Sequence, residues 1–314
     1  MTQLDKASEI VWTDCMGLKK GETSLIVCDK PLKKIGYTLF EKAAELESEA
    51  MLLEMIPLKI HGEEPSPLVA EAMKSADVVV IPASTSLTLT EARRQANAAG
   101  ARIATLPGIT EDIMKRAVPV NYKKIKERST KVANVLSSTS TARITTEAGT
   151  DITFSLNRRK ALSDFGIYHK KGDWGNLPAG EACISPVEGA SYGVVVVDGA
   201  IAGIGKLDAP VTLTVENGMV ETIENCPELE KILNKHGESA RYIAELGVGT
   251  NDKAKVIGNV LEDEKVMGTV HIAMGNNVSF GGTIDVPMHL DCIILNPTLD
   301  VEGGEIIDKG KFLI

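Results

Sequence analysis

Short apolar segments alternate with amphipathic helical patterns in the N-terminal part of this sequence, and this alternation restricts the fold more than any other feature. The helical patterns span residues 5–16, 32–46, 67–75 and 90–99. The strand patterns span residues 24–28, 50–56, 78–81 and 102–106. Strands as uniformly apolar as 78–81 occur where helices cover both faces of a parallel sheet. We therefore expect a three-layer α/β domain over residues 1–128.

The pattern changes after the basic stretch 123–128 and the Ser/Thr-rich stretch 137–141, the second of which we interpret as an exposed linker. Apolar and polar residues then alternate in short segments bounded by glycine turns, at 150–156, 192–197, 211–215 and 219–223. This period of two is typical of strands with one buried face. Residues 129–314 should therefore form a strand-rich α+β domain.

Two turn motifs and one helix complete the prediction for this second domain. The pairs Asp198-Gly199 and Asn217-Gly218 suit tight antiparallel hairpins, because both central positions of such turns need positive φ. A helix is expected over residues 227–235, with Gly237 just beyond its end.

Composition limits the classes of partner. The chain of 314 residues has a net charge of −9 and a pI near 5.2, which disfavours nucleic acid and anionic membranes and favours a divalent cation or a small substrate. No segment resembles a secretion signal or a membrane span of roughly 18 to 20 apolar residues, so we expect a cytoplasmic protein. The five cysteines are scattered and never spaced as CxxC, which indicates reduced core thiols rather than disulfides or a thiolate zinc site.

His289 and Asp291 interrupt the apolar run 286–295, which has the composition of a buried or half-buried strand. Ionisable groups in such a strand need partners. Residues two apart in a strand point to the same face, so this imidazole and this carboxylate can converge on one cation. A metal ion is therefore the first functional hypothesis.

Three further residues join this pair. His271 alternates with apolar residues in the strand-like run 270–275. Glu245 lies among apolar neighbours, where a charge asks for a positive partner whether the segment is a helix end or a strand. Glu181 follows a loop rich in Gly and Pro. The resulting set of nitrogen and oxygen donors suits Zn, Co, Mn or Fe(II), and its ligand number is enough for two cations about 3.5 to 4 Å apart.

Other ionisable residues are left out of the predicted site. His61, His169 and His236 lie in polar or loop contexts without partners at ligand spacing. The acidic cluster 262–264, followed by Lys265, is interpreted as a solvated turn or helix face, from which only Glu262 is kept in reserve.

Four motifs resemble the aminopeptidase T / aminopeptidase S family of dinuclear metallopeptidases, also known as leucyl aminopeptidases. They are NLPAGE at 176–181, ELGVGTN at 245–251, GTVHIAMG at 268–275 and HLD at 289–291. The resemblance extends over nearly the whole chain. It implies a homodimer and a site with two divalent ions (Zn, Co or Mn), one carboxylate bridging, whose ligands are Glu181, Glu245, His271, His289 and Asp291.

The same motifs resemble a related branch, 2,5-dihydroxypyridine 5,6-dioxygenase. There, His271, His289 and Asp291 would form a 2-His-1-carboxylate triad around one Fe(II) ion. Two departures from the peptidases bear on the choice: the stretch 276–280 (NNVSF) lacks the tyrosine that peptidases carry after the first histidine, and the segment between the histidines is shorter. Retention of both Glu181 and Glu245 favours the peptidase, because these residues supply ligands for a second metal.

The leading hypothesis from the sequence is a metallo-aminopeptidase that removes N-terminal residues from peptides by means of a metal-activated water. In it, Glu181 or Glu245 acts as bridging ligand or general base. The alternatives are a mononuclear Fe(II) dioxygenase that cleaves dihydroxypyridine-like rings and a non-catalytic metal-binding homologue.

Overall fold

The computed structural model describes residues 2–314, which divide into two compact units. The first unit consists of the chain up to Tyr122 together with the later segment Phe165–Ala179. The second unit consists of Lys123–Asp164 and Gly180–Ile314. The sequence-based boundary between residues 128 and 129 lies instead inside helix α6 (Tyr122–Ser138). The return of Phe165–Ala179 to the first unit depends on a strand pairing between distant segments, which local periodicity does not reveal.

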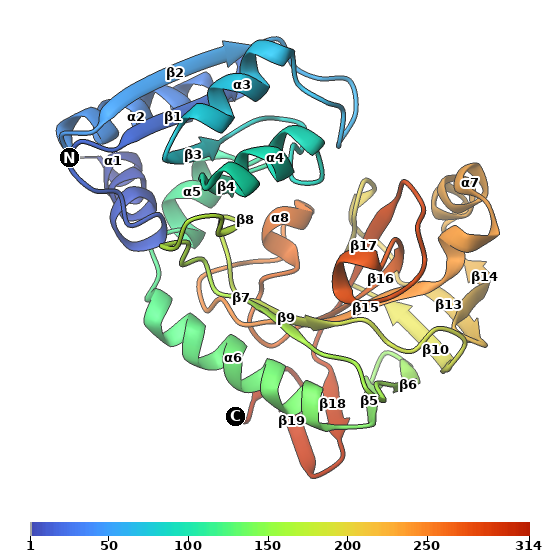
Figure 1. Cartoon of the computed structure of the whole chain (residues 1–314). Coiled ribbons are helices and arrows are strands. Elements are labelled where there is room, and N and C mark those ends of the chain that lie inside the picture. Colours follow the sequence, from blue (N-terminus) through green and yellow to red (C-terminus); the bar gives the residue numbers. More distant parts are fainter. Residues whose placement is uncertain (1) are drawn as a thin grey trace. The chain divides into compact units, whose positions relative to one another are not determined.

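The first unit is the predicted parallel α/β domain (Figure 1). Across the sheet, the strands are β2 (Glu49–Met55), β1 (Thr23–Asp29), β3 (Val78–Ile81), β4 (Arg102–Thr105) and β8 (Trp174–Asn176), and all neighbours pair in parallel. The helices are α1 (Gln3–Ile10), which continues as a π-helical turn over Val11–Cys15, and α2 (Lys33–Glu45), α3 (Pro67–Ser75), α4 (Glu91–Ala99) and α5 (Glu111–Ala117).

Burial on both faces explains the apolar strands of this unit. Val79 and Ile81 of β3 pack in one cluster with Met73 of α3. On the other face, α2 lies so close to β1 that a Cβ on Gly36 would be 2.7 Å from the Sγ of Cys28. Every residue of β3 and β4 is buried, as a sheet covered by helices on both sides requires.

The second unit contains two antiparallel sheets. In order across the first sheet, the strands are β14 (Met219–Glu224), β13 (Val211–Glu216), β10 (Ser191–Val197), β6 (Asp151–Ser155), β5 (Thr141–Thr145), β18 (Thr298–Val301), β19 (Gly304–Asp308) and β20 (Lys311–Phe312). In order across the second, they are β12 (Gly205–Lys206), β11 (Ala200–Ile201), β17 (His289–Ile294), β16 (Val270–Gly275), β15 (Ile243–Gly249), β9 (Glu181–Ile184) and β7 (Leu162–Asp164).

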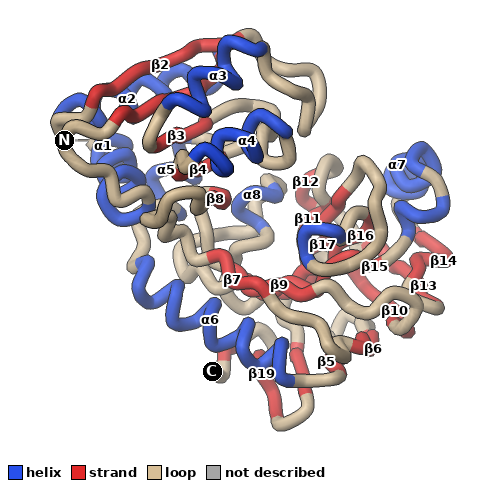
Figure 2. The backbone as a smooth tube through the Cα atoms, in the orientation of Figure 1, coloured by secondary structure: helices blue, strands red, loops and turns tan. Residues whose placement is uncertain are grey.

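Both sheets and two helices contribute to one hydrophobic core in this unit. The core takes Phe154 and Val195 from the first sheet and Leu246 and Ile272 from the second. Helix α6 adds Leu136, and further apolar side chains come from α7 (Pro227–His236). Figure 2 shows the strand-rich character of this unit, which confirms the predicted fold class.

Two local predictions for this unit are wrong and two are confirmed. Helix α7 spans Pro227–His236 and is followed by Gly237, as expected. Asn217 and Gly218 have φ of 49° and 74° and connect β13 to β14 as a hairpin, as expected. Asp198-Gly199 makes no hairpin, because β10 and β11 belong to different sheets, and Asp198 accepts the backbone N–H of Leu295 instead. The Ser/Thr-rich stretch 137–141 is not a linker: it ends α6 and begins β5.

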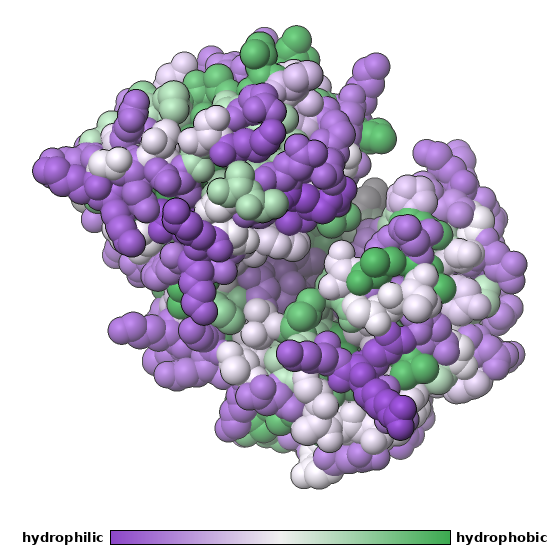
Figure 3. Space-filling model, viewed as in Figure 1, coloured by the Kyte–Doolittle hydropathy of each residue, from purple (hydrophilic) through white to green (hydrophobic). Residues whose placement is uncertain are grey.

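Three expectations from the composition concern the surface, the cysteines and membrane-spanning helices. Hydrophilic residues predominate on the visible face of each unit (Figure 3). All five cysteines are buried and free, which confirms their predicted state. Among residues 2–314, no helix is long and apolar enough to cross a membrane.

Candidate metal centre

The structure brings the five predicted site residues together on four neighbouring strands of the second sheet. Glu181 begins β9, Glu245 lies in β15, His271 lies in β16, and His289 and Asp291 lie in β17. These strands are consecutive in the sheet, in the order β17-β16-β15-β9. The segment around Glu245 is therefore a strand, which settles the choice that the sequence left open.

The antiparallel register places all five side chains on one face of this sheet. Glu245 and Asp291 both lie opposite Ala273 on β16, and residues directly opposite one another share a face. His271 lies opposite Gly247, two residues beyond Glu245 and thus on the same face. The intervening apolar residues, such as Leu246, point to the other face and enter the core.

Glycines on the site face make room for the ligand-type side chains. A Cβ on Gly247 would lie 1.9 Å from Nε2 of His271, so the imidazole lies directly over this glycine. A Cβ on Gly249 would lie 2.0 Å from the carbonyl oxygen of Val266, so Gly249 lets the segment before β16 approach the sheet. The ELGVG motif therefore combines one carboxylate with two positions where a side chain would collide with the site.

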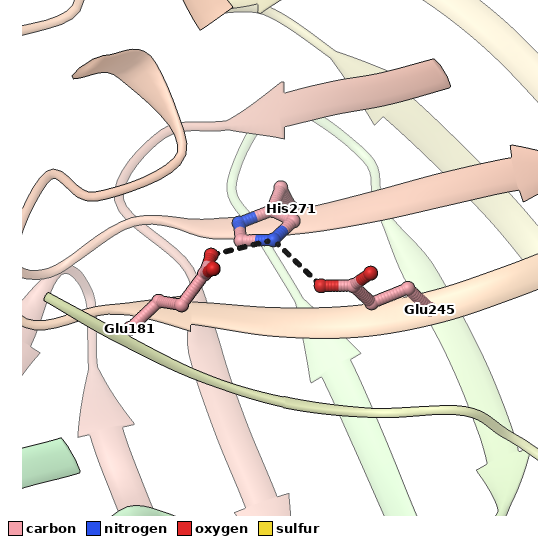
Figure 4. Close-up of side chains that lie close together, drawn as sticks. All are labelled: Glu181, Glu245 and His271. Atoms are coloured by element: carbon pink, nitrogen blue, oxygen red, sulfur yellow. Dashed lines mark hydrogen bonds and ion pairs between the residues drawn. The ribbon is translucent and has the colours of Figure 1, made fainter. Parts of the chain in front are cut away.

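Glu245 is the centre of the cluster. Its Oε1 lies 3.3 Å from Nε2 of His271, and its Oε2 lies 3.2 Å from Nε2 of His289. Glu181 approaches the same Nε2 atom of His271 from the side opposite Glu245, with its Oε2 at 3.5 Å (Figure 4). Oδ1 of Asp291 lies 3.5 Å from Nε2 of His289. One carboxylate thus contacts both imidazoles, and each imidazole contacts a second carboxylate.

The two histidines are held differently through their other ring nitrogen. Nδ1–H of His289 donates to the carbonyl oxygen of Asn276 at 2.8 Å, so Nε2 is the ring nitrogen that faces the carboxylates of the cluster. Phe280 stacks on the same imidazole at a centroid distance of 5.3 Å. Nδ1 of His271 is buried and has no hydrogen-bond partner among the described residues.

Charge and burial shift the pKa values of these groups strongly. Burial alone would lower the pKa of His271, but the carboxylates of Glu245 and Glu181 outweigh it and raise the pKa to about 9. Burial raises the pKa of Glu181. For Glu245 burial also acts upward, but hydrogen bonds from His271 and His289 outweigh it and lower the pKa. The carboxylates thus favour positive charge at the imidazoles, and a bound cation would serve the same purpose.

Sequence reasoning missed Lys265, which lies at the Glu181 end of the cluster. Its side chain is 2% exposed, and Nζ lies 2.5 Å from Oε1 of Glu181 and 2.7 Å from Oε1 of Glu264. Asp164 is 3.7 Å away. Burial acts to lower the pKa of Lys265, but these carboxylates raise it well above its ordinary value, so the ammonium is charged.

The prediction of a solvated acidic turn at 262–264 is therefore wrong. Helix α8 (Val260–Asp263) is buried, and its acids hold the preceding loop: Glu262 accepts the N–H of Lys255, and Asp263 accepts the N–H of Ile257. Glu262 thus has a structural role here. Only burial, which depends on tertiary packing, distinguishes these acids from a surface cluster.

The connection between β16 and β17 is held by hydrogen bonds around the buried side chain of Asn277. Nδ2 of Asn277 donates to Oγ of Ser185 at 3.1 Å and to Oε1 of Glu188 at 2.9 Å. The Oε1 atom of Glu188 also accepts the backbone N–H of Thr283, and Arg159 pairs with the other oxygen. This network keeps in place the loop that carries Phe280 and the carbonyl of Asn276.

The donor atoms form two groups that could each hold a metal ion, one of Glu181, Glu245 and His271 and one of Glu245, His289 and Asp291. Their chemistry fits a divalent cation, because close imidazole nitrogens and carboxylate oxygens are ligands that Zn, Mn, Co and Fe(II) share. His61, His169 and His236 belong to neither group. The role of the five residues as ligands stays a prediction.

Comparison with known proteins relates most of the chain to one enzyme family. The family model of NicX, 2,5-dihydroxypyridine 5,6-dioxygenase, matches residues 14–314. A curated 2,5-dihydroxypyridine 5,6-dioxygenase from Pseudomonas putida is 22% identical over 220 residues, which cover 63% of this chain and 61% of that protein. The match thus spans less than two thirds of the relative's length.

Solved structures show the same fold. The structure of 2,5-dihydroxypyridine dioxygenase from Pseudomonas putida KT2440 has a TM-score of 0.84 at 18% identity and covers 100% of this chain and 98% of its own. Wild-type AmpT from Thermus thermophilus has a TM-score of 0.75 at 16% identity, with 99% of both chains covered. The comparisons therefore support the dioxygenase branch, whereas the aminopeptidase family is supported by fold alone.

Proposed function

Because this chain belongs to the 2,5-dihydroxypyridine 5,6-dioxygenase family, we propose that it is a metal-dependent dioxygenase that cleaves a small hydroxylated pyridine-like ring. In this proposal His271, His289 and Asp291 hold one Fe(II) ion. The observation that carries it is the contact of Glu245 with Nε2 of both imidazoles, together with the contact of Asp291 with Nε2 of His289. Bound Fe(II) supplies redox chemistry and open coordination positions for oxygen and substrate.

The surrounding residues prepare the imidazoles and handle protons. The hydrogen bond from His289 to the carbonyl of Asn276 presents Nε2 rather than Nδ1 to the ion. Phe280 restricts rotation of the His289 ring by stacking on it. Glu181 and Glu245 are the carboxylates next to His271, and we assign to one of the two the removal of a proton from a substrate hydroxyl group.

The proposal is tested on protein reconstituted with Fe(II) under anaerobic conditions. We expect uptake of O2 and loss of ring absorbance with 2,5-dihydroxypyridine or related hydroxypyridines. His289→Ala should abolish the reaction, whereas His236→Ala, at the end of α7, should leave it intact. Absence of O2 uptake over the whole panel of rings would contradict the proposal.

A metallo-aminopeptidase is the second candidate. It is favoured by the presence of Glu181 and Glu245 in the cluster, which offers donors beyond the triad, and by the fold that this chain shares with AmpT. The same preparations, loaded with Zn, Co or Mn, are therefore tested for release of N-terminal residues from peptides. Peptide cleavage without oxygen uptake would replace the dioxygenase proposal by this one.

A further inference from the structure

Lys265 is the one lysine or arginine in residues 2–314 that forms an ion pair with any of the five predicted ligands. Its partner in that set is Glu181, at 2.5 Å. Within the described residues, the positive partners of Glu245 and Asp291 are imidazoles alone. The two groups of metal donors therefore differ in one respect: the group with Glu181 already has a cation next to it.

The backbone fixes the position of this ammonium. The N–H of Lys265 donates to the carbonyl of Glu262, and its carbonyl accepts the N–H of Asn251. Because Gly249 lacks a Cβ, Val266, the residue after Lys265, can lie close to strand β15, which carries Glu245. Glu264 and Asp164 hold Nζ from other sides. The side chain is 2% exposed, so the ammonium is a permanent part of the site and not a mobile surface charge.

We propose that the ammonium of Lys265 serves as a built-in second cation, which occupies one oxygen of Glu181 and restricts this cluster to a single divalent ion. The donor atoms of Glu181, Glu245 and His271 lie within 4.8 Å of one another, so their spacing alone would accept a metal. A divalent ion at the remaining oxygen of Glu181 would be repelled by the ammonium in this buried site, and the carboxylates of Glu181, Glu264 and Asp164 hold the ammonium in place. The metal is therefore directed to the His289 end.

This inference rests on the proposed function for one point only, that His271 holds the single ion of the wild type together with His289 and Asp291. In Lys265→Met, where two ions are expected, His271 would instead ligate the second ion, together with Glu181 and Glu245. Lys265 is thus the residue that determines how many metals the site takes. Replacing Lys265 with an apolar residue of similar length would free Oε1 of Glu181 and leave buried negative charge at the Glu181 end. A second divalent ion would compensate that charge.

The test is a count of bound metal. Wild type, Lys265→Met and Lys265→Arg are stripped with chelator and titrated with Mn²⁺ by calorimetry, and bound Mn is measured after dialysis. We expect one ion per chain in wild type and in Lys265→Arg, and two in Lys265→Met. The two ions should give the spin-coupled EPR spectrum of a Mn(II) pair. Lys42→Met, which removes another buried lysine paired with a glutamate, should still bind one ion.

Folding is controlled separately, because removal of one partner of a buried ion pair is strongly destabilising. If Lys265→Met does not yield folded protein, the double variant Lys265→Met/Glu264→Gln, which removes one stranded carboxylate, is counted in its place. Glu181→Gln in the Lys265→Met background should return the count to one, since the second ion then loses its ligand.

Two ions in wild type, or one ion in both folded variants that lack Lys265, would overturn the inference. The count does not depend on turnover. Wild type with one ion but no reaction with any hydroxypyridine would refute the proposed function and leave this inference intact. Oxygen uptake by a wild type that holds two ions would support the proposed function and refute this inference.

Discussion

The two ends of the ligand cluster share Glu245 and one face of the sheet, but they differ in their neighbours. At one end, Glu181 contacts the buried ammonium of Lys265. At the other, His289 and Asp291 form no ion pair with a lysine or arginine of the described chain, and a backbone carbonyl and Phe280 hold the imidazole. Similar donor atoms can thus be neutralised by the protein itself or left available for a metal.

Removing one carboxylate from each end should break this comparison most clearly. Asp291→Asn takes a ligand from the proposed ion, so we expect metal affinity to fall by about 100-fold or more. Glu181→Gln should retain one metal per chain, but it weakens the ion pair of Lys265 and should lower the free energy of unfolding by about 1 to 3 kcal/mol. Mn²⁺ calorimetry and urea denaturation of the metal-free proteins measure the two effects. Equal loss of metal in both variants would contradict the asymmetry.

Gly247→Ala tests whether the cluster depends on the space that this glycine leaves for the imidazole of His271. The new Cβ would lie 1.9 Å from Nε2 of His271, so the imidazole must move away from Glu245 and Glu181. We expect a loss of roughly 1 to 3 kcal/mol of stability and at least tenfold weaker metal binding. Gly203→Ala is the control: no atom lies within 4 Å of its Cβ, although its φ of 77° adds backbone strain. That variant should bind metal as wild type does.

Glu188→Gln sharpens the comparison at the His289 end, because Glu188 anchors the loop that contacts this histidine. Burial acts to raise the pKa of Glu188, but hydrogen bonds from the Glu188 and Thr283 backbone, Asn277 and the nearby Arg159 outweigh it and lower the pKa. The ionised group therefore stabilises the fold above its unfolded pKa of about 4.3, and this stabilisation is lost as pH falls through the folded pKa.

At pH 7 we accordingly expect Glu188→Gln to be about 1 to 2 kcal/mol less stable than wild type. The difference should shrink toward zero as the pH falls below 4.3, the unfolded pKa, toward the lower folded value. Urea denaturation of both proteins across this range measures it. A difference that grows on acidification would show that the sign of the pKa shift is wrong.

Phe280→Leu should give the smallest effect. It removes the stacked ring from His289 but keeps an apolar side chain, so we expect metal affinity to fall by only a few-fold, in keeping with about 0.5 to 1.5 kcal/mol for an aromatic pair. A fall as large as that of Asp291→Asn would mean that Phe280, rather than the ligands, determines the affinity at this end.

Much of the site could be predicted because strands encode their faces with a period of two. In β16, Val270, Ile272 and Met274 enter the core while His271 faces the site, and this assignment follows from local sequence alone. The same rule placed His289 and Asp291 together. The glycine of the ELGVG motif also has a clear structural reason, since Gly247 leaves the space that the imidazole of His271 fills.

Sequence could not predict features that arise from contacts between distant segments. The isolation of Lys265 from solvent depends on packing against residues as far away as Asp164 and Glu181, so a run of four charged residues was interpreted as surface. For the same reason, Asp198-Gly199 was interpreted as a hairpin, although the chain passes from one sheet to the other there.

The sequence by itself therefore determined the α/β and strand-rich halves and a set of five donor residues, because periodicity and residue chemistry are local properties. Only the tertiary structure decided that strands β17, β16, β15 and β9 lie side by side, that Glu245 joins two groups of donors, and that a lysine lies beside one of them. Strand order and burial are set by the packing of the whole chain, and the charge around each donor follows from them.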